Sequence, residues 1–169
     1  MDLIDGFTIE AWVYNHDNNP VSGIRNIITK AIDNDKHSYS TDIRTGSSKY
    51  NVWIPEGSDW NGHTSDSDIT DNTWSHITVT YNKTHLIWYL NGSDDGSTTS
   101  YNHQVTTNEA NLFIGCQDNG AGGRNQFWDG LIDEARISNT GRTSDWITTS
   151  YNTMTNTTTF VSFGSEQSE

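Results

Sequence analysis

Short segments in which apolar and polar residues alternate recur along most of this chain, and turn-forming residues close each of them. In an extended backbone Phe7, Ile9 and Val13 fall on one face, because successive side chains of a strand point to opposite faces. The clearest segments are residues 74–81 and 86–90, and the Asn91-Gly92 pair after the second is the strongest hairpin signal. This spacing predicts a β-sandwich or jelly roll rather than alternating strands and helices.

The expected strands share this alternation or are short apolar runs bounded by turn residues. They are residues 7–14, 24–32, 39–43, 50–54, 74–81, 86–90, 112–114, 131–137 and 158–163. Residues 56–72 lack periodicity and are expected to form a long polar loop, and residues 117–125 a glycine-rich loop. Ser144 is expected to cap one short helix that runs through Tyr151.

The length of 169 residues suits one domain, so we expect residues 1–169 to form it, with a core over 7–137 and an extension over 138–169. Only 31% of the residues are hydrophobic, but 7 Trp, 7 Tyr and 5 Phe can bury large areas. A packed all-β domain is therefore expected, with Trp12, Trp74, Trp88 and Trp128 as packing residues.

The formal net charge of −13, with Lys and Arg totalling 9, excludes a nucleic-acid partner and disfavours an anionic membrane, because few cations are present to neutralise phosphates. An acidic, oxygen-rich surface suits hard cations, so Ca²⁺ is the first cofactor to consider. No stretch reaches the apolar length of a membrane span, and the first residues lack the pattern of a signal peptide. We expect a piece of a larger protein that is secreted or held at the cell surface.

Four stretches, in this order and spacing, resemble a laminin G-like jelly roll of the concanavalin A-like lectin and glucanase superfamily. They are residues 7–13, 73–81, 86–92 and 128–137. The resemblance implies a two-sheet antiparallel sandwich, and many members of the superfamily bind calcium, glycans or extracellular proteins. Residues 142–152 resemble the tail that follows such domains in large prokaryotic surface proteins, which implies an adhesin-like parent.

Relatives usually have a further strand before the segment that corresponds to residues 7–13, and here only six residues precede it. The strand could lie upstream in a longer protein, could be replaced by residues 158–163, or could come from a neighbouring chain by strand addition. The last possibility supports an alternative function, a structural or assembly subunit of a surface protein or filament.

Asp133 is the first metal-ligand candidate, because the resemblance implies that an Asp at this place in the strand binds a structural Ca²⁺. A carboxylate within an otherwise apolar strand also needs a cation or a hydrogen-bonded partner. The remaining ligands expected for calcium are Asp5, Asp33 and Asp35. The alternative is an ion pair of Asp133 with Arg136 or Arg25.

For ligand binding, exposed aromatic rings beside amides and carboxylates suit sugars, whose C–H faces stack and whose hydroxyls form hydrogen bonds. Trp60, with Asp59 and Asn61, fits this description in the polar loop, although Trp60 could instead anchor the loop. Tyr89 and Trp53 are expected on the concave sheet face, and the rim is expected to hold Asp118, Asn119 and Asn125.

Catalysis is not expected, because related glucanases place two carboxylates at alternate positions of one strand and no such pattern occurs here. The Glu residues are far apart in the sequence, so a catalytic pair is hard to build. The sequence thus predicts a non-catalytic extracellular binding or adhesion module, stabilised by calcium, that recognises a glycan or another surface polymer.

Overall fold

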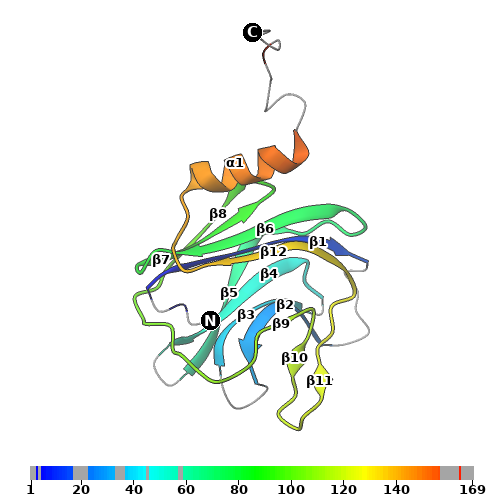
Figure 1. Cartoon of the computed structure of the whole chain (residues 1–169), viewed down its shortest axis with the longest axis vertical. Coiled ribbons are helices and arrows are strands. Elements are labelled where there is room, and N and C mark those ends of the chain that lie inside the picture. Colours follow the sequence, from blue (N-terminus) through cyan, green and yellow to red (C-terminus); the bar gives the residue numbers. More distant parts are fainter. Residues whose placement is uncertain are drawn as a thin grey trace, which may run out of the picture.

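A computed structural model describes residues 3, 5–16, 23–32, 37–44, 46–56, 59–156 and 164. Sheet A has the strand order β12 (Gly130–Ser138), β1 (Phe7–Asn15), β6 (Trp74–Tyr81), β7 (His85–Leu90) and β8 (Ser93–Ser100). Sheet B has the order β5 (Asp59–Asp68), β4 (Lys49–Glu56), β3 (His37–Arg44), β2 (Ile24–Ala31) and β9 (Phe113–Ile114). All pairs are antiparallel, and the two sheets face each other (Figure 1). The predicted two-sheet antiparallel sandwich is confirmed.

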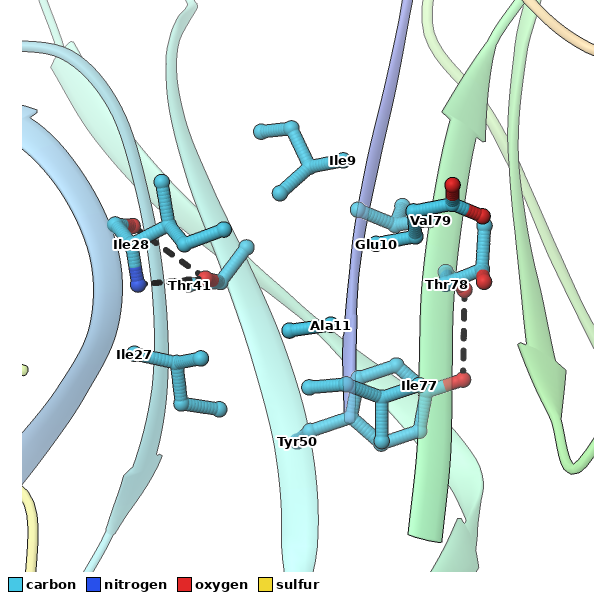
Figure 2. A pocket seen from close by; sticks show the side chains of 10 residues that line it. All are labelled: Ile9, Glu10, Ala11, Ile27, Ile28, Thr41, Tyr50, Ile77, Thr78 and Val79. Carbon is cyan, nitrogen blue, oxygen red and sulfur yellow. Dashed lines mark hydrogen bonds between the residues drawn. The ribbon is translucent and has the colours of Figure 1, made fainter. Parts of the chain in front are cut away.

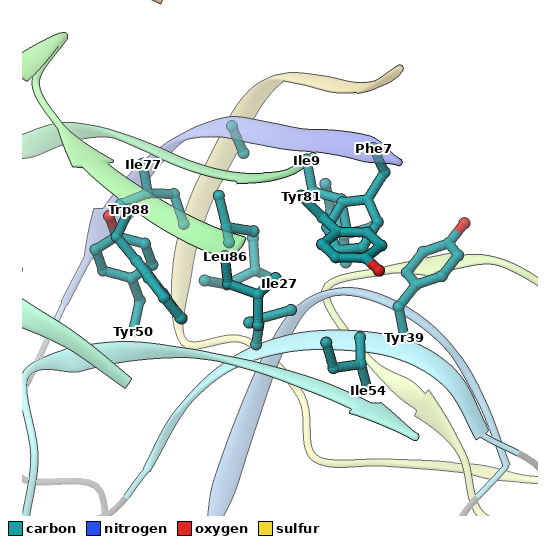
Figure 3. Close-up of a cluster of buried hydrophobic side chains, with 14 of the residues drawn as sticks. Phe7, Ile9, Ile27, Tyr39, Tyr50, Ile54, Ile77, Tyr81, Leu86 and Trp88 are labelled. Carbon is teal, nitrogen blue, oxygen red and sulfur yellow. The ribbon is translucent and has the colours of Figure 1, made fainter. Parts of the chain in front are cut away.

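The core lies between the sheets, where the inward side chains of both sheets meet (Figure 3). Trp88 of β7 and Ile54 of β4 are fully buried there. The Tyr50 hydroxyl crosses the sandwich and donates a 2.7 Å hydrogen bond to the Tyr89 carbonyl, which ties sheet B to sheet A. A narrow gap between the sheets is lined mostly by isoleucine, valine and alanine side chains and belongs to this core (Figure 2).

Strand β1 is paired on both sides, with β12 and with β6. Within the described residues, the edges of sheet A are therefore β12 and β8, and a strand before β1 is not needed to cover β1 itself. The candidate replacement strand, residues 158–163, lies outside the described residues. The source of an additional strand and the predicted domain boundaries remain predictions.

Two expectations about polar segments were wrong. The expected loop over residues 56–72 contains strand β5, which pairs with β4, and strand β8 was not expected at all. Both are edge strands, so they have a pairing partner on one side only and need no apolar alternation to be held in the sheet. The expected glycine-rich loop is a hairpin of β10 (Gln117–Asp118) and β11 (Arg124–Asn125).

Helix α1 (Ser144–Thr155) lies over the outer face of sheet A (Figure 1). The Trp12 ring stacks on Tyr151 at 5.6 Å between centroids, and its Nε1 donates to the Met154 sulfur at 3.2 Å. The Thr148 hydroxyl donates to the Gly92 carbonyl at 2.7 Å. These contacts fix α1 against sheet A, so the two outer faces of the sandwich differ.

The helix is longer than expected, and its N-cap is Thr143 rather than Ser144, since the Thr143 side chain accepts from the Trp146 amide. Of the expected packing tryptophans, Trp88 is buried and Trp128 packs against the core. Trp74 is 39% exposed, so its assignment to the core was wrong. Its position alternates with the inward residues of β6, which places its ring on the outer face.

Candidate functional site

The outer face of sheet B carries polar side chains along its middle strands. Tyr39 and Ile43 of β3 and Val52 of β4 are buried in the core, so the residues between them point outward. We call these outward residues, with their neighbours on β2 and β5, the polar face: Asn26, Ser40, Asp42, Arg44, Asn51, Trp53 and Thr64.

Four members of the polar face are buried although they point away from the core. Asn26, Ser40, Asp42 and Asn51 are each at most 5% exposed. Side chains on an uncovered sheet face are ordinarily solvated, and buried polar groups require hydrogen-bond partners. The polar face is therefore a set of groups fixed by one another rather than a solvated surface.

One group of hydrogen bonds is centred on Asn26. Its Oδ1 accepts from the Ser40 hydroxyl at 2.7 Å, and its Nδ2 donates to Gln126 Oε1 at 2.7 Å and to Gln117 Oε1 at 3.4 Å. The two glutamines belong to the β10–β11 hairpin and the residue that follows it. Asn26 thus connects the middle of sheet B to this hairpin.

A second group is centred on Asp42, which lies opposite Asn26 and Asn51 in the strand register. Asn51 Nδ2 donates to Asp42 Oδ1 at 2.9 Å, and the Thr64 hydroxyl donates to Asn51 Oδ1 at 2.7 Å. Arg44 Nε lies 3.7 Å from Asp42 Oδ1, which makes an ion pair too long for a hydrogen bond.

Burial raises the pKa of Asp42 from 3.8 to about 6. The charge of Arg44 and side-chain hydrogen bonds from Asn51 and Trp53 lower the pKa and offset only part of this effect. The raised value means that removal of the carboxylate from water outweighs its nearby partners. Asp42 accordingly changes charge near pH 6, whereas most other acidic side chains in the described part of the chain are exposed.

The Trp53 ring is held between other residues of the polar face. The Arg44 guanidinium lies over it at 3.9 Å from the centroid, a cation–π contact. Gly62 of β5 lies against the ring as well, and a Cβ added at Gly62 would collide with it. Trp53 does point outward as predicted, but protein contacts occupy its stacking surface.

The predicted rim residues lie in the β10–β11 hairpin beside β2 (Figure 1). Asn119 Oδ1 accepts from the Ala121 and Gly123 amides at 2.9 Å each, and Asp118 Oδ1 accepts from the Gly120 amide at 3.0 Å. Both side chains therefore shape the hairpin turn. Asn125 is half-buried at the end of the hairpin, and a ligand role for these three residues stays a prediction.

The other predicted ligand residues are not gathered at one place. Tyr89 is buried and lies on the outer side of sheet A, so it does not share a face with Trp53. Asn61 lies opposite Ile54, at an inward position of β5. The backbones of Asp59 and Trp60 pair with β4, but their side chains lie outside the described residues, and their roles stay predictions.

The described calcium candidates do not form a metal site together. Asp133 is exposed, lies opposite Trp12, and its Oδ1 accepts from the adjacent Glu134 amide at 2.8 Å. Asp5 precedes β1 and pairs with Lys83 at 3.0 Å. It is separated along β1 from Trp12, the residue opposite Asp133, so the two carboxylates do not lie together. No three His, Cys, Asp or Glu side chains gather as a metal site within the described ranges. Asp33 and Asp35 lie outside those ranges, so a calcium ion stays a prediction there.

The structure does bring two distant glutamates together, contrary to the expectation from their sequence separation. Arg136 lies 3.4 Å from Glu10 Oε1 and 2.5 Å from Glu134 Oε2. Arg136 also donates to Ser150 of helix α1 at 3.1 Å, and Glu10 is 3% exposed. This cluster lies where α1 packs on sheet A, so its geometry fits a structural role better than catalysis on a bound polymer.

The sequence interpretation missed most of the polar face. A usable signal was present, because Ser40 and Asp42 alternate with Tyr39, Thr41 and Ile43 along the strand predicted over residues 39–43, and Arg44 follows directly. Alternation alone assigns such residues to a solvated face. Their mutual hydrogen bonds and burial depend on the register with β2 and β4, which no local pattern specifies.

The family model Laminin_G_3, described as the concanavalin A-like lectin/glucanases superfamily, matches residues 2–148. No curated protein matches the chain. A heptameric SAP-like pentraxin from Limulus polyphemus has a TM-score of 0.65 at 19% identity, over 88% of this chain and 70% of that chain.

Two other similar structures were solved with sugars. Domain 4 of AbnA, an extracellular arabinanase from Geobacillus stearothermophilus, in complex with arabinotriose, has a TM-score of 0.62 at 18% identity, over 86% of this chain and 66% of that chain. The CBM40 of a Ruminococcus gnavus IT-sialidase, bound to sialyllactose, has a TM-score of 0.68 at 11% identity, over 88% of this chain and 83% of that chain. In three further matches this chain spans only 37% or 40% of the matched chain. At these identities the likeness is one of fold.

Proposed function

This chain belongs to the concanavalin A-like lectin/glucanase superfamily, and we propose that it is a non-catalytic carbohydrate-binding module whose ligand lies on the polar face of sheet B. One observation carries the proposal: on the outer face that α1 does not cover, the accessible Arg44, Trp53 and Thr64 are held in place by the buried Asp42 and Asn51 beneath them. Oriented groups of this kind match the hydroxyls of a sugar.

The proposal is supported by the neighbours of similar fold that carry bound arabinotriose and sialyllactose. The domain of the extracellular arabinanase also supports a place outside the cell, as part of a larger protein, which we propose for this chain. No helix among the described residues is long and apolar enough to cross a membrane. An adhesive role would follow if the glycan belongs to a cell surface.

The test is binding of the wild-type chain and an Asn51→Ala variant to an array of immobilised glycans. Asn51 donates to Asp42 and accepts from Thr64, so its loss should disorganise the polar face and weaken binding about tenfold or more. Asn152→Ala, on helix α1 beside the other sheet, is the matched control and should bind as wild type. Binding that Asn51→Ala leaves unchanged, with both variants folded, would place the site elsewhere.

A further inference from the structure

Arg44 stands out within the polar face because its position is fixed while its hydrogen-bonding groups are little used. The guanidinium lies over the Trp53 ring at 3.9 Å, and Trp53 in turn lies against Gly62. This cation–π contact holds the guanidinium over the ring without consuming its N–H donors. Arg44 is therefore preorganised to donate.

Its donors have no adequate acceptor among the described residues. Nε is buried and makes no hydrogen bond there, and its ion pair with Asp42 spans 3.7 Å. Arg136 differs, since it donates to Glu134, Glu10 and Ser150. The Arg44 side chain is 40% exposed, so a ligand can reach it. An unmatched guanidinium favours an acceptor that carries negative charge.

The same contacts disfavour a neutral sugar stacked at this position. A neutral sugar would use an aromatic face for its C–H groups, but Arg44 occupies the face of Trp53. What the polar face presents there is a cation on a ring. We propose that the ligand is an acidic glycan and that Arg44 determines this specificity by binding its carboxylate or sulfate group. This inference rests on the glycan-binding function proposed above.

Asp42 makes this recognition dependent on pH. An anion bound to Arg44 lies near the Asp42 carboxylate, so binding is favoured when that carboxyl is protonated. Among the described residues, the groups that face Asp42 are Arg44 on its own strand, Asn26 on β2, and Asn51 and Trp53 on β4, and of these only Arg44 is charged. Because the pKa of Asp42 is about 6, acidic glycans should bind more tightly below pH 6 than above it.

The test uses matched probes that differ in one anionic group: oligogalacturonate against its methyl ester, 3′-sialyllactose against lactose, and dextran sulfate against dextran. Calorimetric titration is carried out at about pH 5 and about pH 8. At least one acidic probe should bind about tenfold or more tightly than its neutral partner, the range expected for one charge-assisted hydrogen-bonded contact. Arg44→Gln should remove this difference.

The matched control is Arg142→Gln. Arg142 also stacks on a tryptophan, Trp146, at 4.7 Å, but it lies at the start of helix α1 beside sheet A. The Arg142→Gln variant removes the same charge from the other side of the sandwich and should leave the preference for acidic probes intact. Thermal unfolding of both variants checks that they fold.

The outcomes separate this inference from the function on which it rests. Neutral probes that bind as tightly as acidic ones, with Arg44→Gln like wild type, would overturn the acidic specificity and leave carbohydrate binding standing. If Arg142→Gln abolishes the preference for acidic probes as fully as Arg44→Gln does, the preference comes from net charge, and the role of Arg44 is overturned. Absence of binding to every probe and to the glycan array would overturn both proposals.

Discussion

Asp42 shows how a single buried carboxylate can lower the stability of the folded chain at neutral pH. Its folded-state pKa of about 6 lies above the ordinary value of 3.8, so the folded chain binds this proton more tightly than the unfolded chain. The protonated carboxyl therefore contributes fully to stability below the unfolded-state pKa, and this contribution is lost as the pH rises through about 6. At neutral pH the group therefore destabilises the fold, by at most about 3 kcal/mol.

Asp42→Asn should accordingly raise the free energy of unfolding by about 1–3 kcal/mol at about pH 8, and much less at about pH 4, because it removes the buried charge. Urea unfolding at the two pH values measures the difference. Asp68→Asn, at an exposed position of β5, is the control and should show little change at either pH. An Asp42→Asn variant that is destabilised equally at both pH values would contradict the prediction.

At the same scale, the sequence could predict where Trp53 points but not what lies on it. Its neighbours Val52 and Ile54 are apolar, which directs the ring outward. The contact with Arg44 needs the pairing of β3 with β4, and the contact with Gly62 needs that of β4 with β5. The exposure of Asp133 could not be predicted for a related reason, because an acidic residue in an apolar strand looks buried until its edge position is known; its role as a calcium ligand stays a prediction.

Among the elements, helix α1 depends on a small set of side chains for its position. Tyr151 stacks on Trp12 with an interplanar angle of 15° and also lies 6.0 Å from the His76 ring. A Cβ added at Gly92 would lie 2.7 Å from the Tyr151 Cβ, so the helix approaches the β7–β8 turn closely. The helix thus depends on aromatic contact with sheet A.

Tyr151→Ala should lower the free energy of unfolding by about 2–4 kcal/mol, since it removes a half-buried ring and leaves a cavity over Trp12. Thr153→Ala, an exposed position on the same helix, should change it by less than about 0.5 kcal/mol. Denaturant unfolding measures both changes. At denaturant concentrations where Tyr151→Ala is still folded, this variant should keep its glycan binding, because the polar face belongs to the other sheet. Equal stability of the two variants would show that α1 is not held by this stack.

The elements that sequence alone identified are those with a buried side. Strands β1, β6 and β7 each present apolar residues to the core at alternate positions, and all three were expected at nearly their observed bounds. Strands β5 and β8 have few apolar residues, and their pairing depends on backbone hydrogen bonds with one neighbour each. A polar edge strand cannot be told from a loop by side-chain periodicity.

For the whole molecule, the order of motifs predicted the fold, because the four resembling stretches become β1, β6, β7 and β12 of one sheet. The proposed binding face could not be assigned in this way. We place it on the other sheet, and that choice depends on α1 covering the outer face of sheet A (Figure 1). The asymmetry of the sandwich is thus a property of the assembled fold.

The net charge of −13 sets a final condition on an acidic ligand, because the molecule as a whole repels it while Arg44 attracts it. At about 0.01 M salt the Debye length is about 30 Å, so the whole charge acts on the ligand, whereas at about 0.15 M it is about 8 Å and distant charges are screened. The proposed contact forms at a side chain that is only 40% exposed, so salt should weaken it less than it weakens the long-range repulsion. Affinity for the acidic probe should therefore stay level or rise between these salt concentrations, as calorimetric titration would measure. A steep loss of affinity with salt would indicate that fully exposed cations, rather than the half-buried Arg44, hold the ligand.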